Sequence, residues 1–99
     1  MLKSLSDINA QDLVLIEDLA GLFFTPKKIA LMVEISATDM HVAMLNEESD
    51  IYIAFQKGRL QKEVDLRRSI LKLANAGSSP AQTMSLDIFN KSKAEMLDT

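Results

Sequence analysis

The stretch that most constrains the fold runs from Thr25 to Asn46, and its pattern predicts two short helices joined by a tight turn. Thr25 can supply an N-cap oxygen for the first helix. Pro26 follows at the first helical position, where its missing N–H costs nothing. The residues that then share one face at helical spacing are Ile29, Ala30 and Val33.

The second helix of this pair begins after Ile35. Ser36 can accept a hydrogen bond as its N-cap, and Asp39 follows three residues later in the capping-box position. The inner face of the helix is predicted to consist of Met40, Ala43 and Met44. A pair of this size, with a small alanine where the backbones approach, is typical of helix-turn-helix architecture.

Composition favours a folded, all-α chain. At 99 residues the chain suits one domain, and hydrophobic residues make up 47% of it. Gly and Pro are scarce, and the apolar residues are mainly Leu, Ile, Met and Ala, which favours helices over strands. The absence of cysteine excludes disulfides and suits a reducing compartment. No apolar run approaches the roughly 20 residues of a membrane span, so we expect a cytoplasmic protein with no membrane partner.

A further helix is predicted before the pair. Asn9 can cap a helix that runs from Ala10 to about Phe23. Its apolar residues recur at intervals of three and four and are Leu13, Ile16, Leu19, Ala20 and Phe23. With the pair, this helix makes a helix-turn-helix unit over residues 9–47, preceded by an arm that we expect to be loosely held.

The longest predicted element starts near Asp50 and runs to about Ala76, where Gly77 can close it in a left-handed conformation. Its first apolar face consists of Ile51, Ala54 and Phe55, and its second of Leu60, Val64, Leu71 and Ala74. Gly58 lies between these faces. It can mark a kink, a break into two helices, or a close approach of another backbone, so one helix and two helices are equally open here.

The last predicted helix begins at Ser79, with Pro80 first and Gln82 in the reciprocal capping position. It carries Ala81, Met84, Leu86, Ile88 and Phe89, and gives way to a polar tail at 91–99. Because the link is short, we expect it to fold back on the long helix as an αα-hairpin over residues 50–90. The predicted fold is a single all-α domain, residues 1–99.

Charge is distributed unevenly along the chain. Residues 1–50 hold three lysines against nine carboxylates, a net of −6, and the second helix of the pair carries no Lys or Arg. Residues 50–76 hold six basic residues against three acidic ones, a net of +3. Because Lys and Arg supply most non-specific DNA affinity, a nucleic-acid surface would involve the long helix, or a multimer that multiplies the few basic residues beside Lys27 and Lys28. The basic residues taken as candidates are Lys27, Lys28, Lys57, Arg59, Lys62, Arg67 and Arg68. Alternatively, the charges only form a solvated face with pairs such as Glu63–Arg67.

Two segments resemble a known family. The run from Ile29 to Ser36 is similar to the "IA..hGIS" core of helix-turn-helix DNA-binding domains, with Glu34 where such motifs usually place Gly. The run from Tyr52 to Arg59, the charged helix after it and the stretch from Leu73 to Ser78 resemble small terminase subunits of tailed phages and prophages.

The resemblance covers about residues 12–90. It implies a DNA-recognition subunit without catalysis that forms a ring-like homo-oligomer and hands viral DNA to a large ATPase–nuclease partner. The groove-facing residues that it implies are Ser36, Thr38, Asp39, His41 and Val42.

Other chemistry finds little support. His41 is the only histidine and does not share a helix face with Asp39, so no metal site is expected. No phosphate-binding loop, nucleophile elbow or zinc signature is present, so we expect neither a cofactor nor catalysis. Two alternatives to the DNA-packaging adaptor remain. One is a protein-interaction module that oligomerises through its last two helices without binding DNA, and the other is a small transcriptional regulator.

Overall fold

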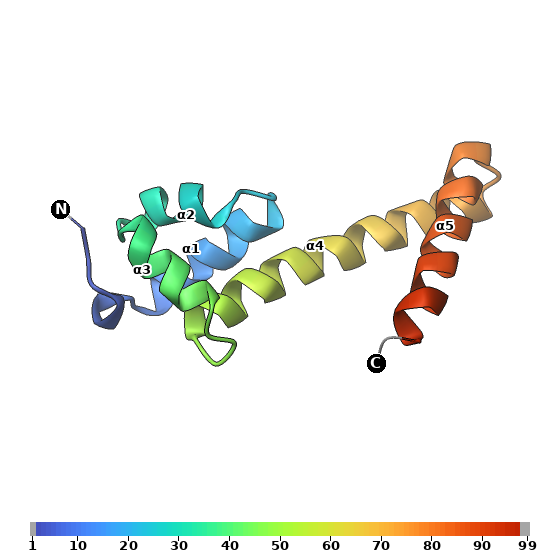
Figure 1. The fold of residues 1–99 in the computed structure, drawn as a ribbon. Coiled ribbons are helices and arrows are strands. Elements are labelled where there is room, and N and C mark those ends of the chain that lie inside the picture. Colours follow the sequence, from blue (N-terminus) through green and yellow to red (C-terminus); the bar gives the residue numbers. More distant parts are fainter. Residues whose placement is uncertain (1, 98–99) are drawn as a thin grey trace. The chain divides into compact units, whose positions relative to one another are not determined.

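The computed structural model describes residues 2–97 (Figure 1). All regular elements in that range are helical, which confirms the predicted all-α class. In chain order they are the 3₁₀ helix η1 (Leu5–Asp7) and the α-helices α1 (Ala10–Gly21), α2 (Pro26–Val33), α3 (Ala37–Met44), α4 (Asp50–Asn75) and α5 (Ser79–Met96). None of the helices between residues 2 and 97 combines the length and the apolar character that a membrane crossing requires.

The chain divides into two compact units, Met1–Lys62 and Glu63–Thr99. The first therefore includes the opening turns of α4 in addition to α1, α2 and α3. The single domain predicted for residues 1–99 stays a prediction. The tail predicted at 91–99 is helical as far as Met96, because its Lys, Ala and Glu residues are good helix formers and no Gly or Pro interrupts them. Residues 98 and 99 lie outside the described part of the chain.

The core of the first unit is built from the apolar faces predicted for α1, α2, α3 and the start of α4. Its buried residues are Ile16, Ala20, Ile29, Ala30, Val33, Ile35, Met40, Ala43, Ile51, Ala54 and Phe55. Asn9 caps α1 as predicted, with its side chain accepting from the Asp12 N–H at 2.9 Å. Thr25 occupies the N-cap position of α2 but makes no side-chain capping bond, contrary to the prediction.

Helix α1 ends earlier than predicted, at Gly21, in a Schellman motif. The N–H of Phe24 donates to Leu19 and that of Phe23 to Ala20, at 3.2 and 2.9 Å. Phe23 adopts the left-handed conformation that this motif requires, with φ 67°, and its side chain is 52% exposed. The prediction that Phe23 lies on the inner face of the helix is therefore wrong, because the motif rotates this residue out of the helical register.

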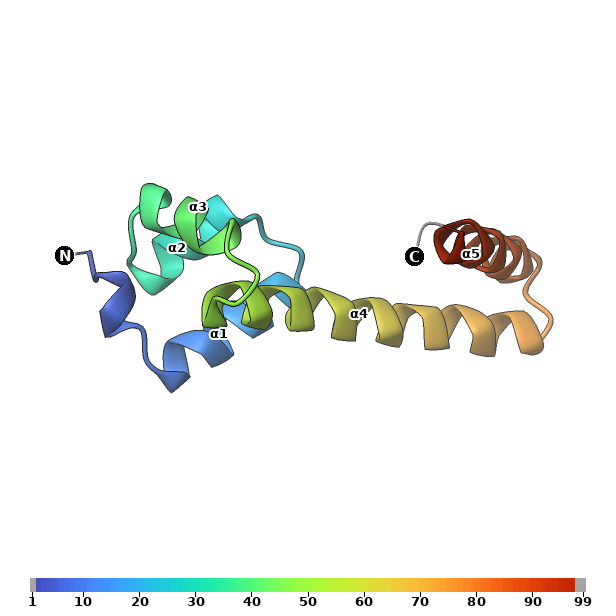
Figure 2. The ribbon, with the colours of Figure 1, turned by 60° about the horizontal axis from the view of Figure 1, so that its bottom comes forward.

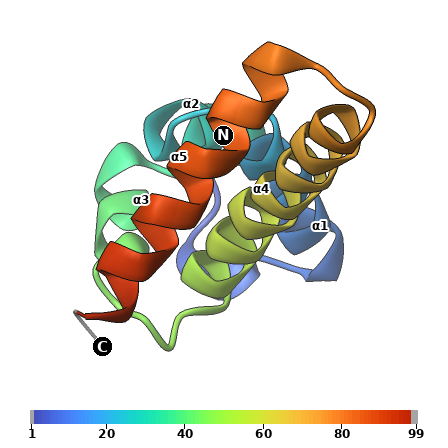
Figure 3. The ribbon, with the colours of Figure 1, turned by 90° about the vertical axis from the view of Figure 1, so that its right-hand side faces the viewer.

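Helix α4 is one continuous helix (Figure 2). Gly58 does not break it. Instead, its missing side chain lets the backbones of α1 and α4 lie against each other (Figure 3). A Cβ at Gly58 would overlap the carbonyl oxygen of Glu17 and come within 3.1 Å of the Ala20 Cβ. Gly21 faces the same contact, since a Cβ there would lie 3.2 Å from the Gly58 carbonyl oxygen. Of the three roles open to Gly58, the close backbone approach is the one observed.

The second unit holds the end of α4, a turn and α5. Gly77 has φ 100°, as its predicted closing role requires. The N-cap of α5 is Ser78 rather than Ser79, and Gln82 donates to the Ala74 carbonyl at 3.2 Å rather than completing a capping box. Ala81 is the only described residue of this unit that is buried. The inner face predicted from Leu60 to Ala74 is wrong for Leu60 and Leu71, which are exposed, because little of the described chain covers them.

Gly58→Ala tests the close approach of α1 and α4. Helix propensity alone would make this substitution stabilising by about 1 kcal/mol. The overlap with the Glu17 carbonyl should reverse the sign and cost about 1–3 kcal/mol of unfolding free energy, measured by urea denaturation. Ser69→Ala, an exposed change on the same helix, is the control and should be neutral or slightly stabilising. A stabilised Gly58→Ala variant would contradict the contact.

Candidate nucleic-acid interface

The turn between α2 and α3 is closed by a residue in an unusual conformation. Glu34 has φ 62° and ψ 42°, the left-handed region, and its N–H bonds to the Ala30 carbonyl. The Ile35 N–H bonds to the same carbonyl at 3.1 Å. The site where helix-turn-helix motifs usually place Gly is thus occupied by Glu in the conformation that favours Gly, at a cost of about 1–2 kcal/mol.

Helix α3 begins at Ala37 with Ser36 as its N-cap, as predicted, but Asp39 does not complete the predicted capping box. The Ser36 Oγ accepts from the Asp39 N–H at 3.0 Å, which satisfies one free donor at the helix start. Met40 and Ala43 point into the core, while Thr38, His41 and Val42 are exposed. Ser36 and Asp39 are half-buried. The accessible side of α3 therefore carries no Lys or Arg.

A groove lies between the N-terminal end of α2 and α3. It has a volume of about 410 Å³ and is lined by Pro26, Lys27, Ala37, Met40, His41 and Met44. It brings Lys27 and His41, two of the predicted site residues, to one place. Met40 and Met44, predicted to form the inner face of α3, also line it.

Lys28 lies on a different side of α2. It lines a second groove, of about 390 Å³, with Leu19, Phe24, Ile29, Leu31 and Met32. Among the described residues, Lys27 and Lys28 make no ion pair, and both are exposed. Consecutive residues of a helix point about 100° apart, which separates the two ammonium groups.

The basic residues of α4 are spread over two units. In the first, the Arg59 guanidinium lies 4.9 Å from the centre of the Phe55 ring, Lys57 is exposed, and Lys62 lines a hollow with Glu17 and Asp18. In the second, Arg67 pairs with Glu63 at 2.8 Å, as predicted from their spacing, and Arg68 is exposed. The Arg59, Lys62 and Arg67 side chains thus already have neighbours.

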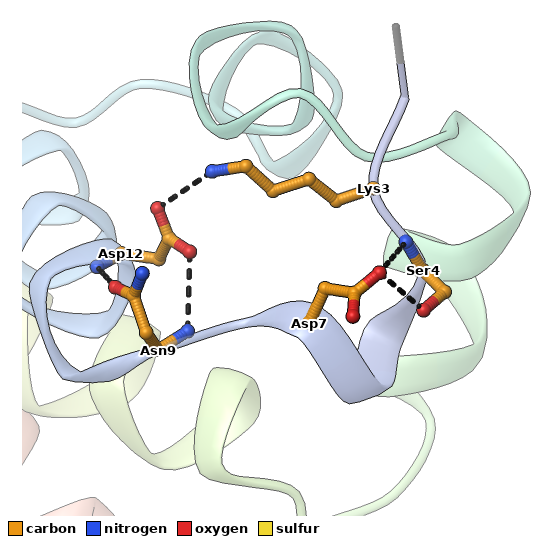
Figure 4. A network of polar contacts seen from close by, with 5 residues as sticks. All are labelled: Lys3, Ser4, Asp7, Asn9 and Asp12. Atoms are coloured by element: carbon orange, nitrogen blue, oxygen red, sulfur yellow. Dashed lines mark hydrogen bonds and ion pairs between the residues drawn. The ribbon is translucent and has the colours of Figure 1, made fainter.

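The N-terminal arm is held, contrary to the expectation of a loose one (Figure 4). The Lys3 N–H donates to the Glu34 carbonyl at 2.6 Å, forming an isolated parallel bridge with Ile35. The Lys3 Nζ reaches the Asp12 Oδ1 at 3.0 Å. The arm thereby ties the α2–α3 turn to the start of α1. Sequence spacing gave no signal for this, because Lys3 and Asp12 meet only once the helices are packed.

Asp12 is the central acceptor of this network. Its carboxylate accepts from the Asn9 N–H at 3.1 Å as well as from Lys3. The Asn9 backbone bond, and then the Lys3 ammonium, hold the pKa of Asp12 below its ordinary value of 3.8, although desolvation acts in the opposite direction. Asp12 is therefore ionised whenever the arm is docked at neutral pH.

Comparisons with protein-family models, with curated proteins and with solved structures found no match. Between residues 2 and 97, no group of three His, Cys, Asp or Glu side chains comes together as metal ligands.

Acidification tests the Asp12 network. Because the pKa of Asp12 is lowered on folding, its ionised form stabilises the fold above about pH 4, and this contribution is lost as pH falls through the lowered pKa. We expect Asp12→Asn to be less stable than wild type at about pH 7, with the difference shrinking as the solution is acidified below about pH 4.

Urea denaturation across this pH range measures both unfolding free energies. The control is Asp18→Asn, which removes an exposed carboxylate of the same helix that has no bond or ion pair among the described residues. A constant difference between wild type and Asp12→Asn at all pH values would contradict the assignment.

Proposed function

We propose that the chain is a non-catalytic DNA-binding adaptor whose α2–turn–α3 segment acts as a helix-turn-helix, similar in role to a phage small terminase subunit. The observation that carries this proposal is the turn at Glu34 with the Ser36 cap, which fixes α3 beside α2 with its Thr38, His41 and Val42 side chains exposed. An exposed, N-capped second helix is the element that reads the major groove in such motifs.

The start of α2 supports a phosphate contact. Thr25 leaves the first N–H groups of the helix without a side-chain cap, and Lys27 and Lys28 follow at once. Free N–H groups at a helix start and a neighbouring ammonium both favour an anion. Lys3 is already paired with Asp12. Residues 2–50 therefore offer two unpaired lysines, which is few for a DNA reader.

An oligomer would compensate for the small number of unpaired lysines in one copy. Each added copy contributes another Lys27 and Lys28, and the salt dependence of binding grows with the number of phosphates neutralised. We therefore propose that DNA is bound by a homo-oligomer, which passes it to a large ATPase–nuclease partner as the family resemblance implies. Cytoplasmic location belongs to the same proposal.

Binding to random duplex DNA across a salt series tests this function. We expect fluorescence anisotropy to show affinity that falls steeply with salt, and Lys27→Ala/Lys28→Ala to flatten the slope of log K by about two per bound subunit. Lys91→Ala/Lys93→Ala removes the same charge from exposed positions of α5 and is the matched control. Binding that survives both Lys27→Ala/Lys28→Ala and Arg67→Ala/Arg68→Ala would contradict the assignment of these residues to the DNA surface, and no binding even at low salt would contradict DNA recognition.

A second candidate function, an oligomerisation module that does not bind DNA, is favoured by the second unit. Ala81 is its only buried described residue, at 4% exposed, whereas many large apolar side chains are exposed. These include Leu66, Leu71, Leu73, Met84, Leu86, Phe89 and Leu97. One buried alanine provides little hydrophobic stabilisation for two helices, so copies that cover each other's leucines would supply it.

Leu71→Asp tests this interface. A carboxylate placed in a contact between copies loses its hydration, so the dissociation constant of the oligomer should rise by at least about tenfold. Molar mass measured by light scattering over a dilution series would report it. Ser69→Asp adds the same charge at an exposed polar position nearby and should leave the mass unchanged. An oligomer that is intact in Leu71→Asp would rule this face out.

A further inference from the structure

The groove that contains Lys28 shares only this residue with the surface proposed for DNA. We call it the apolar groove, lined by Leu19, Phe24, Lys28, Ile29, Leu31 and Met32, with a volume of about 390 Å³. The groove lined by Lys27 and His41 lies on another side of α2 and shares none of these residues. A ligand in the apolar groove would therefore leave Lys27 and His41 accessible.

The Schellman motif at the end of α1 builds one wall of the apolar groove. Its Phe24 N–H bond to Leu19 brings together two of the groove's apolar residues. Beside them, Phe23 is exposed in a left-handed conformation that a bulky residue rarely adopts. Strained backbone that displays an aromatic side chain is concentrated at binding sites.

The other wall is helix α2. Leu31 and Met32 are 74% and 60% exposed, so the rest of the first unit does not cover them. An eight-residue helix is about 12 Å long, which matches about two turns of a second helix laid beside it. Two turns present apolar residues at i, i+3 or i+4 and i+7, the usual pattern of helix-in-groove recognition.

Charge selects the partner. Lys28 is the only charged residue lining the apolar groove, and no carboxylate lines it. Two copies meeting through this face would bury both Lys28 ammonium groups in one interface with no carboxylate from either groove to pair with them, which opposes self-association. A partner that carries a carboxylate beside its apolar stripe would pair with Lys28 instead. We propose that the apolar groove binds an amphipathic, acidic α-helix of a partner protein.

The test uses two synthetic helical probes that differ only in charge. Each is a fluorescein-labelled peptide of about 18 residues with Leu at i, i+3, i+4 and i+7, flanked by Glu in one probe and by Lys in the other. By anisotropy, the full chain should bind the Glu probe about fivefold more tightly than the Lys probe. Lys28→Glu should reverse this preference. Equal binding of both probes, or no binding of either, overturns the proposal.

Location is tested with a matched pair of exposed leucines. Leu31→Ser should weaken the Glu probe at least about tenfold, whereas Leu45→Ser should change it less than about twofold. Leu31 and Leu45 are equally exposed, at 74% and 73%, so neither change should unfold the chain. An equal loss in both variants overturns the location.

Light scattering without the probe tests whether a second copy of this chain occupies the apolar groove instead. If Leu31→Ser lowers the molar mass, the face joins copies of this chain, and the proposal of an acidic partner is wrong. The inference does not depend on DNA binding. Leu31→Ser should leave DNA affinity unchanged, so a failure of either proposal can be recognised without the other.

Discussion

The contact on which the first unit depends is the backbone approach of α1 and α4 at Gly58. Helices normally pack through side chains, about 8–10 Å apart, and only glycine allows a closer crossing. Here Gly58 meets the Glu17 carbonyl and Gly21 faces Gly58 in return. The approach sets the opening turns of α4 against α1, so that Ile51, Ala54 and Phe55 complete a core that three short helices alone would leave open.

Two backbone positions in the first unit carry a cost that glycine would avoid. Phe23 and Glu34 both have φ above 60°, and each ends a helix that borders a proposed binding surface. The Glu34 carbonyl also accepts a hydrogen bond from the Lys3 N–H, so the N-terminal arm holds the strained turn in place. Natural sequences violate local preferences mostly where function requires it, which is consistent with selection for what these turns position rather than for stability alone.

The sequence was a good guide to local structure and a poor one to what covers each helix. The caps at Asn9 and Ser36, the buried faces of α2 and α3, and the Glu63–Arg67 pair all follow from spacing along one helix. The docking of Lys3 on Asp12 and the exposure of Leu71 depend on which distant elements meet, and local periodicity carries no such information. Lys27 and His41 were proposed separately, and only the fold shows that they share a groove.

The two units differ in how much of their apolar surface is buried. The first buries a contiguous core, so its exposed Leu31 and Met32 are not needed for folding and are free to serve recognition. Among the described residues of the second unit only Ala81 is buried, so its exposed leucines are the surface that the proposed oligomer would cover. Removing an exposed leucine from the first unit should therefore weaken binding of the proposed acidic helix and leave the oligomer intact. Removing one from the second should change assembly first and DNA affinity only as a consequence, because fewer lysines would then act together.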